Sequence, residues 1–228
     1  MPGPLGDPRL EALLERLHGE SAGQVESMTA YFGKRASEGS LDWNAFDEDA
    51  NTFLRDKLVA LDRDKAELCY LLCRALGATR VVEAGSSFGV STLYLAAAVR
   101  DNAGRGAARG IVIGTEYEPS KAAAARANFA AAGLSEFVDL REGNLRQTLL
   151  NVGGPVDFML IDIWVPLALP ALRLVLPRLR PGAMVVCDNT ARFRDAYREY
   201  LDFIHDPANG LRTRTLPFEG GLELSVRA

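Results

Sequence analysis

From residue 80 onward, short apolar runs alternate with stretches of helical pattern, and this alternation constrains the fold more than any other feature. Apolar runs rich in β-branched residues favour buried strands. The strands expected on this basis are 80–84, 109–114, 137–141, 156–161 and 183–187, and the helices expected between and after them are 90–100, 119–132, 144–150, 167–179 and 194–205. Such an alternation predicts βαβ units and a mostly parallel sheet, which is an α/β fold.

Both ends of the chain depart from this alternation. Residues 8–76 have helical patterns only, which predict a helix around residues 10–17, a second around 25–32, a third over 46–61 and a fourth that starts near Asp62 or Asp64 and ends at Gly77. Residues 211–216 and 222–226 show period-two alternation on either side of a Pro/Gly-containing segment, which predicts a C-terminal antiparallel hairpin.

The bulk properties exclude several classes of protein. A chain of 228 residues suits one domain with a substantial core. A net charge of −4 without a basic run offers no general attraction to nucleic acid or anionic membranes, so nucleic acid is not an expected partner. No apolar run approaches the ~20 residues of a membrane span, and residues 1–8 lack a signal-peptide pattern, so we expect a cytoplasmic protein. Cys69, Cys73 and Cys187 are expected to be buried packing residues.

A glycine-containing turn follows the first expected strand. Gly85 and Gly89 allow backbone conformations and close approaches that a Cβ would obstruct. Such a turn brings backbone N–H groups and a helix N-terminus up to a polar ligand. The second expected strand leads to Glu116, whose carboxylate could hold a ribose diol. Together these features indicate a nucleoside cofactor, and the alternative is a tight βα turn in another α/β domain.

The spacing of the glycines narrows the choice of nucleoside. The dinucleotide fingerprint needs G-x-G-x-x-G after the strand, and here only Gly85 and Gly89 are present. No phosphate-binding loop with its lysine follows a strand either. A pyrophosphate is therefore poorly provided for, and S-adenosylmethionine, a single nucleoside with an amino-acid tail, fits better.

Polar residues stand at all five carboxyl ends of the expected parallel strands, where open α/β sheets bind their ligands. They are Glu83 to Gly85, Glu116, residues 142–144, Asp162, and Asp188 with Asn189. If the strands before Asp162 and Asp188 are neighbours, two carboxylates and an amide oxygen converge, and such hard ligands suit Mg²⁺. The alternative is that these residues cap the helices that follow.

Four segments in this order resemble class I S-adenosylmethionine-dependent O-methyltransferases, in particular the catechol and caffeoyl-CoA O-methyltransferase group. They are residues 81–91, 114–119, 159–164 and 181–189, and the resemblance covers roughly residues 60–228. It implies a Rossmann-like, seven-stranded, mostly parallel sheet with an antiparallel C-terminal hairpin and extra N-terminal helices. It also implies a methyltransferase core over 77–228, with residues 1–76 as a helical layer of the same domain that covers the substrate side and could form a homodimer interface.

The resemblance assigns roles to residues at matching positions. The turn at 85–89 would pass beside the methionine part of the cofactor, Ser91 would hold its carboxylate, and Glu116 would hold the ribose hydroxyls. Residues 143–146 would border the adenine, with Trp164 stacked near it. The full cofactor-binding set expected on this basis is Glu83, Gly85, Ser86, Ser87, Gly89, Ser91, Glu116, Tyr117, Gly143, Asn144, Leu145, Asp162 and Trp164.

The resemblance also implies a metal site and a reaction. Asp162, Asp188 and Asn189 match the family's three protein ligands for a divalent metal, usually Mg²⁺. In that family the metal binds two vicinal oxygens of the acceptor and lowers the hydroxyl pKa, so Asp162 would orient both metal and substrate. The implied activity is methyl transfer from S-adenosylmethionine to an oxygen of a small hydroxylated acceptor, which the sequence does not identify.

One position departs from the family pattern. The family's usual general base is a lysine shortly after the metal-binding aspartate, and here Val165 stands in its place and cannot accept a proton. A metal could acidify the acceptor sufficiently, the acceptor could need no base, or the protein could bind the cofactor without turnover. Lys65 is a candidate replacement base, and a solvated lysine at a helix start is the alternative. An RNA-modifying methyltransferase and a nicotinamide oxidoreductase are rivals that the charge, the glycines and the hairpin disfavour.

Overall fold

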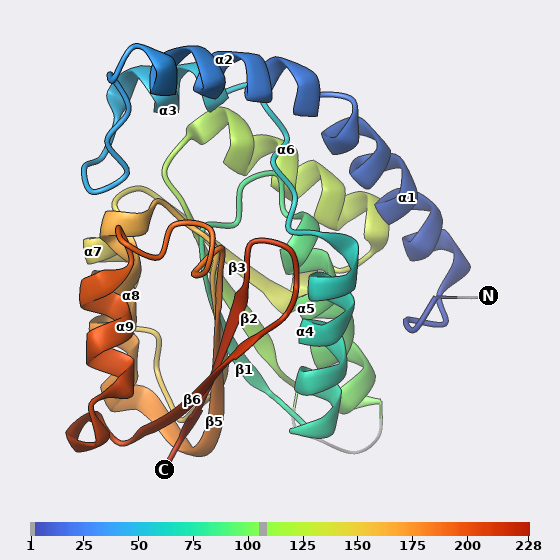
Figure 1. The fold of residues 1–228 in the computed structure, drawn as a ribbon. Coiled ribbons are helices and arrows are strands. Elements are labelled where there is room, and N and C mark those ends of the chain that lie inside the picture. Colours follow the sequence, from blue (N-terminus) through green and yellow to red (C-terminus); the bar gives the residue numbers. More distant parts are fainter. Residues whose placement is uncertain (1–2, 105–108) are drawn as a thin grey trace.

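A seven-stranded sheet forms the centre of the molecule (Figure 1). The computed structural model describes residues 3–104 and 109–228. The strands are β1 (Arg80–Ala84), β2 (Ile111–Glu116), β3 (Val138–Glu142), β4 (Val156–Ile161), β5 (Leu179–Asp188), β6 (Leu211–Leu216) and β7 (Leu222–Arg227). Their order is β3-β2-β1-β4-β5-β7-β6, with β1 to β5 parallel and β7 antiparallel to both β5 and β6. The predicted sheet and its C-terminal hairpin are thereby confirmed.

The central strands are apolar because helices cover both of their faces. All six residues of β4 and all but the first residue of β1 are buried. This continuous burial explains why the sequence shows apolar runs at these strands rather than alternation, as is usual for parallel sheets. The hairpin strand β6 alternates between buried and exposed positions at its start, which matches its period-two pattern.

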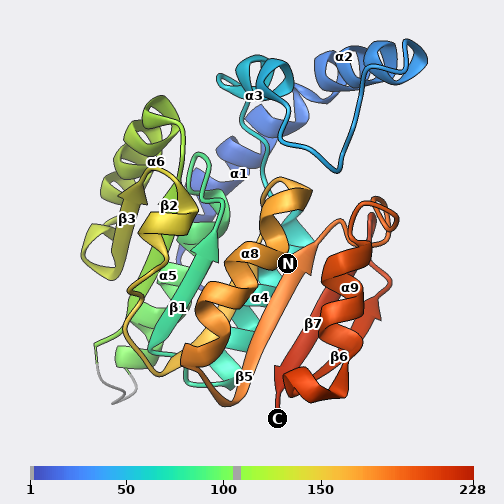
Figure 2. The ribbon, with the colours of Figure 1, turned by 90° about the vertical axis from the view of Figure 1, so that its left-hand side faces the viewer.

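Nine α-helices lie within the described residues. They are α1 (Pro8–Ala22), α2 (Val25–Ser37), α3 (Glu48–Leu54), α4 (Arg63–Ala75), α5 (Val90–Ala103), α6 (Pro119–Ala132), α7 (Leu145–Thr148), α8 (Val165–Val175) and α9 (Arg198–His205). Residues of α1, α4, α5 and α6 share one hydrophobic core with one face of the sheet, and residues of α7, α8 and α9 share a second core with the other face. Figure 2 shows the two helical layers on either side of the sheet.

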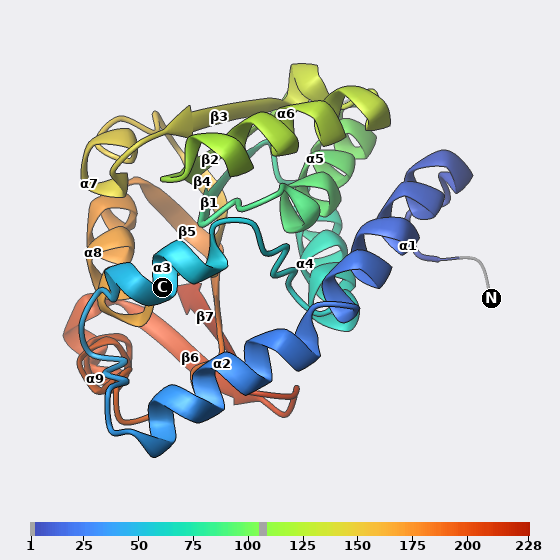
Figure 3. The ribbon, with the colours of Figure 1, turned by 90° about the horizontal axis from the view of Figure 1, so that it is seen from above.

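Helices α2 and α3 cross above the carboxyl ends of the parallel strands (Figures 1 and 3). None of the residues of α2 is buried, so this helix contributes little to either core. The two helices are joined by their aromatic side chains, because the rings of Tyr31 and Phe53 stack with centroids 3.8 Å apart. The N-terminal region thus forms a layer over the sheet edge at which ligands are expected.

The predicted helix over 46–61 is only partly present. Helix α3 ends at Leu54, and the chain from there to α4 is not helical. Side chains of the preceding helical region accept the hydrogen bonds of this segment: Leu58 N donates to Gln24 Oε1, and Ala60 N donates to Ser21 Oγ. These long-range contacts replace the helical hydrogen bonds that the apolar spacing predicts. The three cysteines are buried and free, as expected.

Candidate cofactor and acceptor site

A cavity of about 1180 Å³ lies at the carboxyl ends of the parallel strands, below α2 and α3. Its walls come from the turn after β1, from the ends of β2, β4 and β5, and from the N-terminal layer. Most of the predicted site residues line it: Gly85, Ser86, Ser87, Ser91, Glu116, Tyr117, Gly143, Asn144, Leu145, Asp162, Trp164, Asp188 and Asn189. Glu83, Gly89 and Lys65 are not among its lining residues. The volume exceeds that of a typical single-ligand pocket.

The glycine turn has the close approaches that its composition suggests. Gly85 and Gly89 have positive φ values of 95° and 82°. A Cβ on Gly85 would lie 2.0 Å from the backbone oxygen of Asp162, and a Cβ on Gly89 would lie 2.5 Å from the ring of Phe129. Both positions therefore require glycine, and Gly85 allows the turn after β1 to lie directly against the end of β4.

Glu83 supports this turn from behind the cavity wall. Its buried carboxylate accepts hydrogen bonds from Ser86 Oγ at 2.6 Å, from Ser91 Oγ at 2.7 Å and from the hydroxyl of Thr92. Burial raises the pKa of Glu83, and the three hydroxyl groups oppose this rise. Because Ser91 donates its hydroxyl proton to Glu83, its oxygen offers the cavity a lone pair, which suits the ammonium group of a methionine tail rather than the carboxylate that the resemblance assigns to it.

Glu116 connects the turn after β1 with the turn after β2 at the end of the cavity expected to hold the cofactor. It is the last residue of β2, and its Oε2 accepts a hydrogen bond from Ser87 N while its Oε1 accepts one from Glu118 N, both at 2.8 Å. The carboxylate is therefore held in one orientation at the cavity wall. Each of its oxygens retains a further lone pair, which suits a pair of hydroxyl donors such as a ribose diol.

Lys65 lies behind the opposite end of the cavity, and only 1% of its surface is exposed. Its Nζ is 2.8 Å from Asp188 Oδ1 and 2.8 Å from Asp62 Oδ2. Burial disfavours its charge, but the hydrogen bonds to Asp188 and Asp62 outweigh burial and raise the pKa of Lys65. The side chain is a cation held in an ion pair. The burial of Lys65 corrects its interpretation as a solvated lysine, and a charged lysine in two ion pairs is poorly suited to the role of a general base.

The predicted metal ligands Asp162, Asp188 and Asn189 line this end of the cavity together with Asp62, and we call these four residues the acceptor edge. Asn189 Nδ2 donates to Asp188 Oδ2 at 2.8 Å. Burial, together with the charges of Asp188 and Glu83, raises the pKa of Asp162 to about 8. Among the described residues none donates a hydrogen bond to the Asp162 carboxylate. The carboxylates of Asp162 and Asp188 and the amide of Asn189 are hard oxygen donors of the kind that a divalent cation such as Mg²⁺ takes, although no group of three or more His, Cys, Asp or Glu side chains arranged to hold a metal lies within residues 3–104 and 109–228.

Val165, the first residue of α8, also lines the cavity, and its side chain is almost fully buried. It is three residues after Asp162 in the chain and lines the same cavity as the acceptor edge. A valine at this place contributes an apolar surface and no proton acceptor.

Aromatic residues of the N-terminal layer complete the cavity wall, and sequence reasoning missed them. The ring of Trp43 lies 4.4 Å from that of Phe193 and 6.3 Å from that of Trp164, measured between centroids. Phe46 lies 5.7 Å from Trp164 in the same way. The segment between α2 and α3 has no apolar period to draw attention to it. Its two large aromatic residues, Trp43 and Phe46, close together between two helices, were the available signal.

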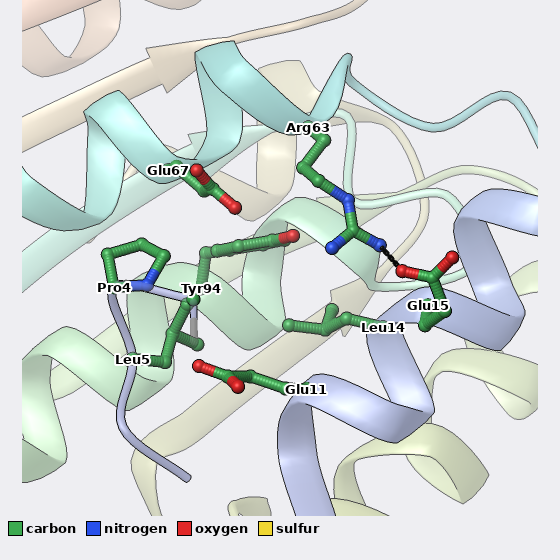
Figure 4. Close-up of a pocket in the computed structure, with 9 residues that line it drawn as sticks. Pro4, Leu5, Glu11, Leu14, Glu15, Arg63, Glu67 and Tyr94 are labelled. Carbon is green, nitrogen blue, oxygen red and sulfur yellow. Dashed lines mark hydrogen bonds and ion pairs between the residues drawn. The ribbon is translucent and has the colours of Figure 1, made fainter. Parts of the chain in front are cut away.

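A second, smaller cavity of about 440 Å³ lies between α1, α4 and α5 (Figure 4). Its side chains include Glu11, Glu67 and Tyr94, and an ion pair between Arg63 and Glu15 at 2.5 Å crosses one side. None of the predicted site residues lines it. It lies away from the carboxyl ends of the strands, so the larger cavity is the candidate site.

The strand order, the antiparallel hairpin and the cavity at the strand ends define the class I methyltransferase fold. Residues 82–190 match a family described as a methyltransferase domain. The chain is 33% identical over 136 residues to a catechol O-methyltransferase of Mycobacterium tuberculosis, and the match covers 59% of this chain and 58% of that protein. It is 30% identical over 138 residues to a catechol O-methyltransferase of Niastella koreensis, covering 59% of each.

A solved structure is similar over a longer part of the chain. The O-methyltransferase from Bacillus cereus in complex with SAH superposes with a TM-score of 0.68 at 22% identity, over 79% of this chain and 88% of that chain. The match to the curated relatives spans less than two thirds of their length. These comparisons confirm the resemblance to class I S-adenosylmethionine-dependent O-methyltransferases of the catechol and caffeoyl-CoA group. No helix in residues 3–104 and 109–228 is both long and apolar enough to cross a membrane.

Proposed function

We propose that this protein is an S-adenosylmethionine-dependent O-methyltransferase that acts on a small hydroxylated acceptor. The observation that carries the proposal is a single cavity with two chemically different ends. Glu116 and the glycine turn lie at one end, and Asp162, Asp188 and Asn189 lie at the other. The names of the curated relatives support the same reaction.

At the cofactor end, the protein offers groups that match the ribose, the methionine chain and the adenine of S-adenosylmethionine. The fixed carboxylate of Glu116 would accept hydrogen bonds from the ribose hydroxyls, and the backbone of the 85–89 turn would pass beside the methionine part. Gly143, Asn144 and Leu145 would border the adenine. The sulfonium charge of the cofactor would favour the ionised form of Asp162, whose pKa is raised to about 8 in the protein alone.

At the acceptor edge, Asp162, Asp188 and Asn189 would hold a divalent metal, which when bound lowers the pKa of an acceptor hydroxyl. Trp43, Phe46 and Phe193 would form an apolar wall around the acceptor. We propose that the N-terminal layer acts in this way as a cover that excludes water and orients the acceptor oxygen toward the methyl group. Such orientation supplies a large part of the acceleration in a transfer between two bound molecules.

The acceptor proton needs a route out of the cavity. Val165 cannot accept it, and Lys65 already holds its own proton in two ion pairs. We propose that the proton passes to water at the open side of the cavity, or that the acceptor enters already ionised. A series of substituted catechols tests these routes. If the acceptor enters already ionised, the rate should depend on the pKa of its hydroxyl group, because this pKa sets the ionised fraction in solution.

Two measurements test the proposal. Isothermal titration with S-adenosylhomocysteine should show binding with one site per chain, and absence of binding would exclude the proposed function. Methyl transfer from labelled S-adenosylmethionine to a catechol should then be followed with and without EDTA. Full activity in EDTA would remove the metal from the proposal while leaving methyl transfer in place.

A second candidate function is binding of the cofactor without turnover, and Val165 is the observation that favours it. The variant Val165→Lys restores an amine at the family's usual position. If the parent methylates a catechol and the variant does not exceed it, the loss-of-catalysis interpretation fails. If only the variant turns over, that interpretation is supported.

A further inference from the structure

We infer that the buried ammonium group of Lys65 is a fixed positive charge behind the acceptor edge, and that it weakens the hold of this edge on a divalent cation. The inference rests on the proposed function for the meaning of the acceptor edge, but not for its test. Lys65 acts through Asp188 and is separated from the cavity, so its role is to set the charge of the edge.

The geometry places the ammonium group on the protein side of the carboxylates. Asp62, Asp162 and Asp188 line the cavity, whereas Lys65 is not among its lining residues. The Nζ atom lies 2.8 Å from Asp188 Oδ1 and 2.8 Å from Asp62 Oδ2. Two of its three N–H bonds are thereby used by carboxylates that face the cavity with their remaining lone pairs.

A cation in the cavity would share Asp188 with Lys65. The two positive charges would then lie on opposite sides of one carboxylate and repel each other at short range. Asp188 is buried, and only about 1% of Lys65 is exposed, so mobile ions screen this repulsion less than they would at a surface. The charge of Lys65 is therefore expected to reduce the affinity of the acceptor edge for a divalent ion.

The ammonium group of Lys65 also lowers the repulsion between carboxylates in the metal-free protein. The carboxylates of Asp62 and Asp188 share one ammonium group, so part of their mutual repulsion is relieved without any bound ion. A metal is then a further positive charge added to an edge that already contains one. The sequence distance between Lys65 and Asp188, 123 residues, explains why no motif reveals this pair.

The test measures Mn²⁺ affinity by the loss of the free-ion electron paramagnetic resonance signal, on the full chain without added cofactor. Carboxylate sites that take Mg²⁺ also take Mn²⁺. Lys65→Gln removes the charge but keeps an N–H donor for Asp188, and it should bind Mn²⁺ roughly tenfold more tightly or better. Lys65→Arg keeps the charge and should remain close to the parent. Lys57→Gln is the matched control, since Lys57 forms an ion pair with the exposed Asp56.

Unchanged or weaker Mn²⁺ binding in Lys65→Gln would overturn the inference, as would a lack of Mn²⁺ binding in every protein tested. If Lys65→Gln does not fold, Asp62→Asn serves instead, because 56% of the Asp62 side chain is exposed. Because Asp62→Asn also removes a carboxylate that lines the cavity, it is compared with Asp62→Asn/Lys65→Gln, which should bind Mn²⁺ several-fold more tightly than Asp62→Asn, whereas equal affinity would contradict the inference. Titration of the same proteins with S-adenosylhomocysteine keeps the two proposals apart. A shift in Mn²⁺ affinity without cofactor binding would leave this inference standing and exclude the proposed function.

Discussion

Glu116 is the residue whose replacement most directly tests the cofactor end. We expect Glu116→Gln to weaken S-adenosylhomocysteine binding by roughly tenfold to a hundredfold, because hydrogen bonds to a charged group contribute about 1.5–3 kcal/mol. Isothermal titration measures the loss. Glu142→Gln is the control: Glu142 ends the neighbouring strand β3, is exposed and pairs with Arg126. Equal affinity in the parent and Glu116→Gln would contradict the assigned role.

At the scale of single residues, the sequence correctly predicted which side chains line the cavity when they lie at the end of a strand. Asp162, Asp188 and Asn189 follow from the rule that ligands gather at the carboxyl ends of parallel strands, and all three line the cavity. The burial of Lys65 was not predictable in this way, because both its burial and its charge depend on a partner that is distant in sequence. A lysine near a helix start is ordinarily solvated, and only the packing of α4 against the end of β5 reverses this.

At the scale of elements, the close packing of Gly89 in the turn between β1 and α5 predicts how much an alanine there would destabilise the fold. An alanine there would need a left-handed backbone and would place its Cβ 2.5 Å from the ring of Phe129. We expect Gly89→Ala to lower the free energy of unfolding by roughly 2–4 kcal/mol. Gly133→Ala is the matched control, because Gly133 has a positive φ of 68° with nothing within 4 Å of the added Cβ. It should cost only the backbone strain, about 1–2 kcal/mol.

Urea unfolding of the two variants separates the cost of the left-handed backbone from the cost of the contact between the added Cβ and the ring of Phe129. A Gly89→Ala variant as stable as Gly133→Ala would mean that the ring of Phe129 moves aside freely, and that the turn is less tightly packed than its distances indicate.

The elements themselves were predictable to different degrees. The strands at 80–84 and 156–161 and the helix at 119–132 match their predictions residue for residue, since continuous apolar runs and clear end signals determine them. The segment after Leu54 was not predictable, because Ser21 and Gln24 of the preceding helical region accept its backbone hydrogen bonds. Local pattern cannot report a hydrogen bond that the folded chain supplies from elsewhere.

At the scale of the whole molecule, the N-terminal layer is held to the core by helix α1, which packs on α5 and α6. His18 of α1 takes part in this attachment, because its Nε2 lies 3.1 Å from the hydroxyl oxygen of Tyr94 in α5. Burial, and then the charge of Arg63, lower the pKa of His18 below 6.5, while Glu15 and Asp62 oppose this shift. The folded protein thus favours the neutral ring, whose Nε2 shares a hydrogen bond with the Tyr94 hydroxyl group.

The sign of the resulting pH dependence follows from linkage. The stability that neutral His18 contributes is complete above pH 6.5 and is lost as the pH falls toward its lowered folded pKa, because the unfolded chain takes up the proton first. Asp162, with its pKa raised to about 8, acts in the opposite direction, since the folded state gains stability as this carboxylate is protonated.

The two effects are separated by comparing a His18 variant with the parent at each pH. His18→Gln keeps an acceptor for Tyr94 and removes the titration. We expect its melting temperature to fall less than that of the parent between pH 7.5 and pH 5.5, measured by circular dichroism. His205→Gln, in α9 on the other face of the sheet, is the matched control for the loss of a histidine. An equal fall in the melting temperature of the parent and of His18→Gln across this range would show that the charge of His18 does not affect the packing of α1 on the core.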